Sequence, residues 1–396
     1  MSDIQHFYII GMSDDNRLSF PAEVDEIIAK GKVFSGGKRH HELVASLLPE
    51  KAVWIDITVP IKEVFKKYEG IPEIVVFASG DPLFFGFANT VRRELPNARI
   101  ILYPTFNSLQ MLAHRLVIPY QEMRSISLTG RPWDKFDAAL IEGEMMIGLL
   151  TDREKTPSAI AERMLCFGYD NYRITVGEEL GNKDKERIRS FYPHEMIHET
   201  FNNPNCMILE RTAVHPRPFG IPETAFHLLD GRAKMITKMP IRLLTLSMLE
   251  LRTKESFWDI GFCTGSVSIE AKLQFPQLYV TSFEQREEGR ELMEMNSRKF
   301  GTPGIQTVIG DFLSCDLSSL TAPDAVFIGG HGGKLIEMLA VIDKVLRPGG
   351  CIVFNSVSEE SLNLFHEGVD KIGRQIVGNV RITVDQNNTI EIIKAQ

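Results

Sequence analysis

A glycine-containing turn in the second half of the chain has the residue types that hold a nucleotide-like cofactor. The apolar run at 257–260 leads into the segment 259–270, which reads DIGFCTGSVSIE. Because glycine has no side chain, a ligand can approach the backbone at Gly261 and Gly265, and the helix behind the turn offers free N–H groups. This arrangement suits the carboxylate end of an amino-acid-like cofactor.

Two acidic residues farther along the chain complete the expected binding pattern. Glu284 ends the next strand-like run, where a carboxylate can accept hydrogen bonds from both hydroxyls of a ribose. Asp311 follows Gly310 after the next apolar run, where adenine recognition is expected. NAD and S-adenosylmethionine both fit such a site, but the form Asp259-x-Gly261 differs from a GxGxxG turn and favours S-adenosylmethionine. A tight turn without a ligand is the remaining interpretation.

A second glycine turn lies in the first half of the chain. The apolar run at 74–78 ends in Ser79-Gly80-Asp81-Pro82, where proline fixes φ before the next helix. Such a turn exposes backbone groups at the carboxyl end of a strand, where open α/β sheets bind ligands. Gly-Asp-Pro by itself is a weak signal, so its context must separate a binding loop from an ordinary turn.

The elements that position these turns alternate as in α/β domains. Strand-like runs of the N-terminal half lie at 7–10, 74–78, 99–103 and 145–150, and helical patterns at 21–30 and 85–95. A second series of strand-like runs lies at 257–260, 278–283, 325–329 and 351–354. Between the two series, Pro216, Pro218 and Gly220 break any regular element. We therefore predict an α/β domain at 1–211, a linker at 212–220 and a second α/β domain at 221–396.

The C-terminal half resembles the decarboxylating precorrin methyltransferase domain over nearly all of 221–396. The resemblance rests on ITK at 236–238, the turn at 259–270 and PDAVFIGGHGG at 323–333. It implies a Rossmann-like class I methyltransferase fold with S-adenosylmethionine as its cofactor. The residues that would contact the cofactor are Thr237, Gly261, Phe262, Cys263, Thr264, Gly265, Glu284, Asp311 and Phe312. Those that would face the substrate are Gly329, Gly330 and Gly332. The family has glycine at the position of Cys263, so a side chain must fit beside the cofactor here.

The N-terminal half resembles the tetrapyrrole methylase family, in particular its C5-methylating branch, over 7–211. The supporting motifs follow the Gly-Asp-Pro turn in order: PTFNSLQMLAHR at 104–115, SLTGR at 127–131, LTD at 150–152 and EELG at 178–181. The resemblance implies a two-lobed fold. The residues that would line its cofactor cleft are Gly80, Asp81, Leu83, Ser108 and Thr151. The family begins with a GxGPG-like loop, whereas this chain reads GMSDD at 11–15.

Together the two resemblances imply an enzyme on the route to vitamin B12 with a tetrapyrrole substrate. The N-terminal half would methylate C5, and the C-terminal half would methylate C15 and remove the carboxyl group of the C12 acetate. Lys38 and Arg39 follow a short strand-like run and could pair with acetate and propionate arms of the substrate. A solvated charged loop explains these two cations equally well. Because related proteins of both families form oligomers, a homo-oligomer is expected.

Composition and charge narrow the class of protein. The net charge is -8 and no lysine or arginine tract is present, which counts against nucleic-acid binding. The chain shows no signal-peptide pattern and no apolar run near the ~18 residues of a membrane span, which predicts a cytoplasmic protein. Five scattered cysteines without a CxxC pair indicate reduced thiols.

Two other classes of protein stay open at this point. A nucleic-acid or protein methyltransferase fused to a regulatory ligand-binding domain is disfavoured by the acidic charge. A nucleotide-binding module without catalysis is disfavoured because two separate cofactor turns are present.

Two histidine motifs also have competing interpretations. His194-Glu195-Met-Ile-His198 matches the HExxH pattern of zinc proteases, but no third ligand is evident, so no metal is expected. His331 lies in the glycine-rich segment 329–333 and could assist proton transfer. A packing or capping role is favoured for this histidine, and no other catalytic residue is indicated.

Overall fold

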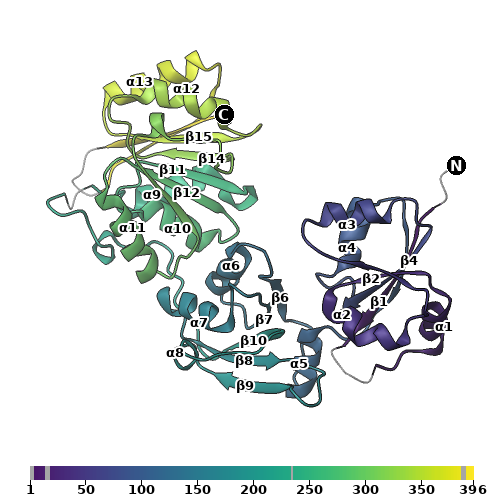
Figure 1. The fold of residues 1–396 in the computed structure, drawn as a ribbon. Coiled ribbons are helices and arrows are strands. Elements are labelled where there is room, and N and C mark those ends of the chain that lie inside the picture. The colour runs from purple at the N-terminus through teal and green to yellow at the C-terminus, as the bar shows by residue number, and fades with distance from the viewer. Residues whose placement is uncertain (1–3, 14–17, 233–234, 385–388) are drawn as a thin grey trace. The chain divides into compact units, whose positions relative to one another are not determined.

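The chain folds into two compact units, each of the α/β class (Figure 1). The computed structural model describes residues 4–13, 18–232, 235–384 and 389–396. The first unit contains residues up to 131 together with 145–161 and 172–211. The second contains 132–144, 162–171 and 212–396. Residue 211 thus ends one unit, while two inner segments of the N-terminal half group with the second unit.

The first sheet of the N-terminal unit is parallel throughout, in the order β3-β2-β4-β1-β5. Its strands are β1 (His6–Met12), β2 (Val33–Gly36), β3 (Val53–Asp56), β4 (Glu73–Ser79) and β5 (Arg99–Tyr103). The helices between them are α1 (Ala22–Lys30), α2 (Lys38–Val44), α3 (Ile61–Tyr68) and α4 (Phe87–Glu94). Strand β4 is buried over most of its length, as its run of apolar residues predicts for a central parallel strand.

The second sheet of this unit is mixed, in the order β6-β7-β10-β8-β9. Its strands are β6 (Arg124–Ser127), β7 (Met146–Leu150), β8 (Tyr172–Glu178), β9 (Arg187–Phe191) and β10 (Asn205–Arg211). Only β6 and β7 pair in parallel among these described strands. The accompanying helices of this unit are α5 (Ser108–Leu116) and α8 (Pro193–Met196). Helix α6 (Asp134–Glu142) and the second half of α7 (Pro157–Cys166) group with the second unit. Two sheets in succession agree with the two lobes expected for this half.

The sheet of the C-terminal unit has the strand order β13-β12-β11-β14-β15-β17-β16. Its strands are β11 (Ser256–Ile260), β12 (Tyr279–Glu284), β13 (Ile305–Ile309), β14 (Ala325–Ile328), β15 (Cys351–Ser356), β16 (Ile376–Ile382) and β17 (Ile390–Ala395). Strand β17 runs antiparallel to both its neighbours, and the other pairs are parallel. Strand order reverses between β11 and β14, which is where open α/β sheets bind ligands at the carboxyl ends of their strands.

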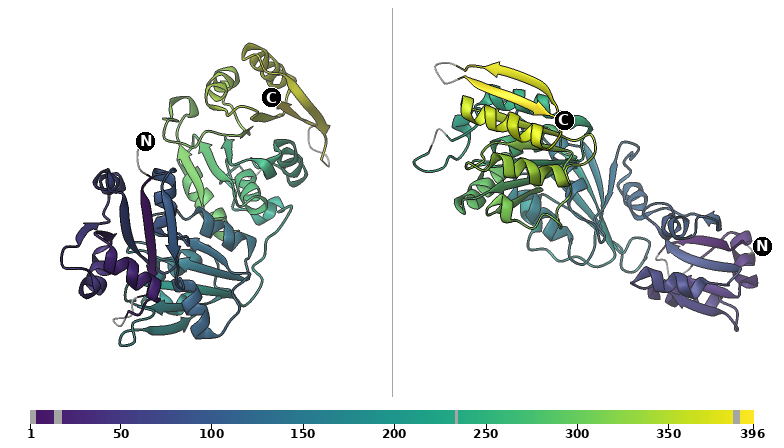
Figure 2. Two further views of the ribbon diagram at one scale, coloured as in Figure 1. Left: turned by 90° about the vertical axis from the view of Figure 1, so that its right-hand side faces the viewer. Right: turned by 90° about the horizontal axis from the view of Figure 1, so that it is seen from above.

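Helices cover both faces of this sheet (Figures 1 and 2). They are α9 (Met239–Leu249), α10 (Ser266–Gln274), α11 (Glu288–Lys299), α12 (Leu335–Val345) and α13 (Glu359–Lys371). Helices α12 and α13 share a buried core with Trp258 and Ile328, whereas α9 and α10 share another with Phe257 and Phe327. Adjacent residues of β11 and β14 thus pack into cores on opposite faces of the sheet, because successive side chains of a strand point to opposite faces.

The strands and helices expected from the sequence are present in both units, and the predicted α/β class is confirmed. The interpretation of Lys38 and Arg39 as part of a charged loop is wrong in one respect, since both residues lie in the first turn of α2. Part of the altered first loop, residues 14–17, lies outside the described residues. No helix in the described part of the chain is long and apolar enough to cross a membrane.

Candidate functional site

The turn after β11 lies directly against the glycine-rich loop after β14. Gly261 has a φ of +80°, and a Cβ added to it would lie 2.8 Å from the backbone nitrogen of Gly330. A side chain at this position would therefore push the two loops apart and would also strain the backbone. Glycine at position 261 is required both by the conformation of the turn and by this close approach.

Cys263 has a positive φ although it is not glycine. Its φ is +50°, a region in which side chains are rarely found. Its backbone N–H donates to Oε2 of Glu284 over 3.0 Å, and its thiol donates to the carbonyl oxygen of Met235 over 2.9 Å. Burial raises the pKa of the thiol, and the nearby Glu284 carboxylate raises it further. Cys263 therefore links the glycine turn to the segment that precedes Thr237.

The side chain of Glu284 is 5% exposed at the end of β12 and accepts hydrogen bonds from three donors within the described chain. Besides the N–H of Cys263, the backbone N–H of Arg286 and its Nη1 both contact Oε1 over 3.1 Å. Both donors of Arg286 thus lie on one carboxylate oxygen, while the other oxygen contacts the glycine turn.

Asp311 follows β13 and carries two interactions of its own. It caps the short 3-10 helix η4 (Phe312–Ser314) by accepting the N–H of Leu313 over 3.1 Å. Lys334, which follows the glycine-rich loop, donates from Nζ to Asp311 Oδ2 over 2.7 Å. This lysine holds the pKa of the Asp311 carboxyl below its usual range, with a further contribution from the Leu313 N–H.

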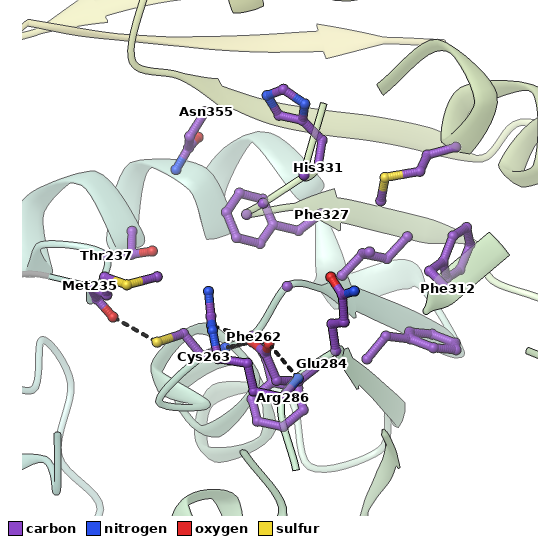
Figure 3. A pocket seen from close by; sticks show the side chains of 18 of the residues that line it. Met235, Thr237, Phe262, Cys263, Glu284, Arg286, Phe312, Phe327, His331 and Asn355 are labelled. Atoms are coloured by element: carbon purple, nitrogen blue, oxygen red, sulfur yellow. Dashed lines mark hydrogen bonds and ion pairs between the residues drawn. The ribbon is translucent and has the colours of Figure 1, made fainter. Parts of the chain in front are cut away.

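These residues surround a cavity of about 700 Å³ (Figure 3). The expected residues that line it are Thr237, Gly261, Phe262, Cys263, Glu284, Asp311, Phe312, Gly329, Gly330, His331 and Gly332. The residues that the sequence did not single out include Met235, Arg286, Phe327, Lys334 and Asn355. Figure 3 shows Glu284, Arg286 and Cys263 on one side of this space and His331 with Asn355 on another.

Two expected contact residues lie behind the turn, outside the described lining of the cavity. Thr264 is completely buried, and its Oγ1 has no hydrogen-bond partner among the described residues. Gly265 has a φ of +75° and stands at the start of α10. Both residues shape the turn, and the backbone N–H of Gly265 already donates to the carbonyl oxygen of Phe262 over 2.9 Å.

Asp259 is a buried carboxyl beneath the turn. Its Oδ2 accepts hydrogen bonds from the N–H and the hydroxyl of Ser268, and its Oδ1 has no partner within the described chain. Burial raises the pKa of Asp259 to about 7, despite the opposing hydrogen bonds from Ser268. The sequence identified Asp259 only as part of the motif, because burial of its side chain depends on the fold.

His331 lines the cavity with one ring nitrogen already occupied. Nδ1 accepts the N–H of Gly333 over 3.2 Å, so the proton of the neutral ring lies on Nε2. The ring contacts Phe354 edge to face, and burial lowers its pKa despite the attraction of Glu360. His331 thus packs against Phe354 and holds the loop at Gly333, and its role in proton transfer stays a prediction.

A second cavity, of about 420 Å³, lies in the N-terminal unit. Of the expected residues, Gly80, Ser108 and Arg39 line it. Gly80 has a φ of +61°, and a Cβ there would lie 2.9 Å from the Cα of Asn107, so the two loops are in close contact. The apolar part of the lining includes Phe77, Phe84, Phe85, Phe87, Phe106 and Met111.

Four other expected residues lie outside the described lining of this second cavity. Asp81 accepts the N–H of Leu83 over 2.8 Å, and the side chain of Leu83 is 49% exposed. Thr151 donates its hydroxyl to the carbonyl oxygen of Asn205 over 2.8 Å. Lys38 is exposed. These side chains support the loops around the cavity or face solvent.

His40 also lines this cavity, and the sequence did not single it out as a site residue. Its Nδ1 accepts the N–H of Gly37 over 3.2 Å, and its Nε2 contacts the hydroxyl of Ser79 over 2.8 Å. Burial lowers the pKa of His40 to about 4, with a further contribution from Arg39. The signal available for His40 was its position in the segment that follows a short strand-like run, which ends at Gly36.

The HExxH motif does not have the geometry of a zinc site. Helix α8 is four residues long and ends at Met196, so His194 and His198 do not share a helix face. Within the described ranges, no group of three or more His, Cys, Asp or Glu residues could hold a metal ion.

Comparisons with known proteins show the family to which this chain is similar. A family model described as a precorrin methyltransferase domain matches residues 228–394. A precorrin-6Y C(5,15)-methyltransferase (decarboxylating) from Sinorhizobium is 33% identical over 359 residues, covering 89% of this chain and 84% of the relative. A cobalt-precorrin-6B C(15)-methyltransferase (decarboxylating) from Salmonella typhimurium is 37% identical over 135 residues, covering 34% of this chain and 69% of the relative.

A solved structure of a precorrin-6Y C5,15-methyltransferase from Geobacter metallireducens is also similar. It is 31% identical, covers 46% of this chain and 99% of its own, and has a TM-score of 0.42. The Sinorhizobium relative matches across both units, at an identity and coverage that establish common membership. The chain belongs to the family of decarboxylating precorrin-6Y C5,15-methyltransferases.

Proposed function

We propose that this chain methylates precorrin-6Y, or its reduced or cobalt-containing form, at C5 and C15 and removes the carboxyl group of the C12 acetate, as a step of cobalamin biosynthesis. The methyl donor is S-adenosylmethionine. Residues 1–211 carry out the C5 methylation, and residues 221–396 carry out the C15 methylation and the decarboxylation. The main support is the cavity at the carboxyl ends of β11, β12 and β13, which gathers the residues expected to bind the cofactor.

The C-terminal cavity fits S-adenosylmethionine in its residues and in its size. The backbone around Gly261 lies open to the cavity, where it suits the amino-acid end of the cofactor. Glu284 is the proposed acceptor for the ribose diol, and Asp311 is the proposed acceptor for the adenine amino group; both line the cavity. A volume of about 700 Å³ leaves room for part of a second molecule beside the cofactor.

The protein's contribution to methyl transfer is alignment and exclusion of water. The bound cofactor supplies an electrophilic methyl group, and the nucleophilic carbon of the tetrapyrrole must approach it in line. Phe262, Phe327 and Met338 give the cavity an apolar wall. Lys238 and Arg286 also line the cavity and supply positive charge for the carboxylate arms of the substrate. Few reacting side chains are needed for this step.

Decarboxylation imposes one further requirement. When the C12 acetate loses CO2, its methylene carbon must take up a proton to become a methyl group. His331 lines the cavity and is the candidate donor in its imidazolium form, which passes its Nε2 proton to the methylene carbon and returns to the neutral ring. In the N-terminal unit, Gly80 and Ser108 are the proposed cofactor contacts, with Asp81, Leu83 and Thr151 around the loops that carry them. Arg39 is the proposed partner of a substrate carboxylate there.

The alternative of a nucleic-acid or protein methyltransferase with a regulatory domain is not supported. The relatives that match most of the chain are named as precorrin methyltransferases. We further propose that the protein acts in the cytoplasm as a homo-oligomer. Cell fractionation and light scattering on the purified protein test these two points.

Mass spectrometry of reaction products tests the assignment of one reaction to each unit. Purified protein is incubated with S-adenosylmethionine and each form of the tetrapyrrole, and the products are examined for two added methyl groups and one lost CO2. Gly80→Ala and Gly261→Ala form a matched pair, because each puts a Cβ into a tight turn with positive φ.

These two variants allow the reaction of each half of the chain to be tested separately. Gly80→Ala is expected to abolish C5 methylation alone, and Gly261→Ala to abolish C15 methylation together with the decarboxylation. Loss of both methylations in each variant would contradict the assignment of separate sites. Absence of any reaction with every tetrapyrrole would refute the proposed function.

A further inference from the structure

Arg286 occupies a binding position that the cofactor is expected to need. Its Nη1 lies 3.1 Å from Glu284 Oε1, and its own backbone N–H contacts the same oxygen at the same distance (Figure 3). The other carboxylate oxygen accepts the N–H of Cys263 over 3.0 Å. Three donors of the described chain therefore contact the carboxylate proposed to bind the ribose.

The number of acceptor sites on this carboxylate decides whether all these contacts can persist. An ionised carboxylate offers about four lone-pair sites. With three of them in use, about one remains, whereas a ribose diol brings two O–H donors to Glu284. One of the present donors must therefore leave when the ribose binds through both hydroxyls.

The side chain of Arg286 is the donor that can leave. The N–H groups of Cys263 and Arg286 belong to the backbone of the turn and of the strand end, where the hydrogen bonds of Gly261 and Phe262 to Phe283 fix the geometry. The guanidinium is held by a single 3.1 Å contact to Glu284 among the described contacts, and its side chain is 35% exposed. Its movement requires only side-chain rotation.

A displaced guanidinium lies in a cavity that the substrate must also enter. Arg286 lines the cavity together with Lys238 and Lys334. Lys334 is paired with Asp311 at 2.7 Å, and Lys238 lies close enough to Glu223 to lower the pKa of that carboxyl. Arg286 is positively charged throughout. When the cofactor takes its place on Glu284, the guanidinium loses its carboxylate partner. Its planar fork suits a substrate carboxylate.

We propose that Arg286 is a switch between cofactor and substrate: ribose binding releases its guanidinium from Glu284, and the released guanidinium then binds a carboxylate of the tetrapyrrole. The inference rests on the proposed function of the C-terminal unit. It makes substrate affinity depend on cofactor occupancy. Since such coupling is reciprocal, the tetrapyrrole must strengthen cofactor binding by the same factor.

The decarboxylation rate tests this proposal, because CO2 release reports the C-terminal reaction alone. The KM for the tetrapyrrole is measured at S-adenosylmethionine concentrations below and above the KM of the cofactor. In the wild type the KM for the tetrapyrrole is expected to fall by about fivefold or more as the cofactor saturates. In Arg286→Gln it should stay high at every cofactor concentration, while the KM for S-adenosylmethionine stays equal or falls, because no guanidinium has to be displaced.

Two further variants separate this role from a general effect on charge. Arg286→Lys keeps the charge and should retain part of the coupling. Arg290→Gln removes an exposed cation of α11 that pairs with Glu287, and it should behave as the wild type. Thermal unfolding of each variant checks that the fold is retained.

Several outcomes would overturn the proposal. If Arg286→Gln raises the KM for S-adenosylmethionine and leaves that for the tetrapyrrole unchanged, Arg286 only orients Glu284. If the wild type shows no dependence of one KM on the other ligand, the switch does not exist. Both results leave decarboxylation intact, so they differ from failure of the proposed function, in which the wild type releases no CO2 from any tetrapyrrole.

Discussion

Replacing Arg242 by methionine should destabilise the C-terminal unit strongly. The side chains of Arg242 and Glu270 are both 0% exposed, and Nε lies 2.6 Å from Oε2. The guanidinium also donates to the carbonyl oxygens of Thr237 and Ile221, and its Cζ lies 5.2 Å from the centre of the Phe226 ring. Methionine approximates the volume of the side chain and removes the charge and all its donors.

The expected magnitude follows from the carboxylate that remains. Glu270 keeps hydrogen bonds from the N–H groups of Gly220 and Ile221, but it has no countercharge in a dry environment. Breaking a buried ion pair on one side costs about 3–5 kcal/mol, whereas replacing both partners by apolar residues is often close to neutral. Arg242→Met should therefore lose about 4 kcal/mol, and Arg242→Met with Glu270→Leu should recover about 2 kcal/mol or more of it.

The measurement must report the C-terminal unit alone, because a chain of two units need not unfold in one step. Hydrogen exchange of peptides from β11 and β14 provides this, since both strands are buried at the centre of the sheet. A loss below about 1 kcal/mol in the single variant, or a double variant no more stable than the single one, would refute the reasoning.

Three further perturbations probe the turn and two titratable groups, Asp259 and His40. Cys263→Gly removes the strain at φ +50° but adds chain entropy to the unfolded state. These effects oppose each other, so the free energy of unfolding measured in urea should change by less than about 1 kcal/mol. Cys263→Val should lower this free energy by about 1–2 kcal/mol. The pKa of Asp259 is raised to about 7 in the folded protein, so the unfolded chain ionises at lower pH. The free energy of unfolding should therefore fall as pH rises from 4 to 7. Asp259→Asn should remove this pH dependence from the free energies measured by urea unfolding. The pKa of His40 is lowered to about 4 in the folded protein, so the unfolded chain takes up the proton at higher pH. The free energy of unfolding should therefore fall as pH drops from 6.5 to 4, and His40→Asn should lack this part of the pH dependence. An unchanged pH dependence in the variant would contradict burial of a neutral ring.

The elements of both units were predictable because their sequence signals are local. Apolar runs become the central parallel strands β4, β11, β12 and β14, and each glycine turn follows the strand that its motif predicts. Gly261, Glu284 and Asp311 line one cavity because parallel strands end at the same edge of a sheet.

The less predictable part of the site depends on contacts between distant segments. Arg286 and Lys334 reach the two predicted carboxylates from positions with no motif of their own. The sequence also could not separate contact residues from supporting ones: Thr264 is completely buried behind the turn, whereas the neighbouring Cys263 lines the cavity. That distinction depends on how the turn is placed against the sheet.

Cys263 brings a chemical hazard into a methylating site, because sulfur attacks electrophilic methyl groups more readily than most carbon nucleophiles do. The reactive form is the thiolate, and burial beside Glu284 keeps the thiol protonated by raising its pKa. The hydrogen bond to the carbonyl oxygen of Met235 orients the S–H bond toward the preceding segment. This environment keeps the thiol in its less nucleophilic form beside the proposed cofactor site, at a position where the resemblance predicts glycine.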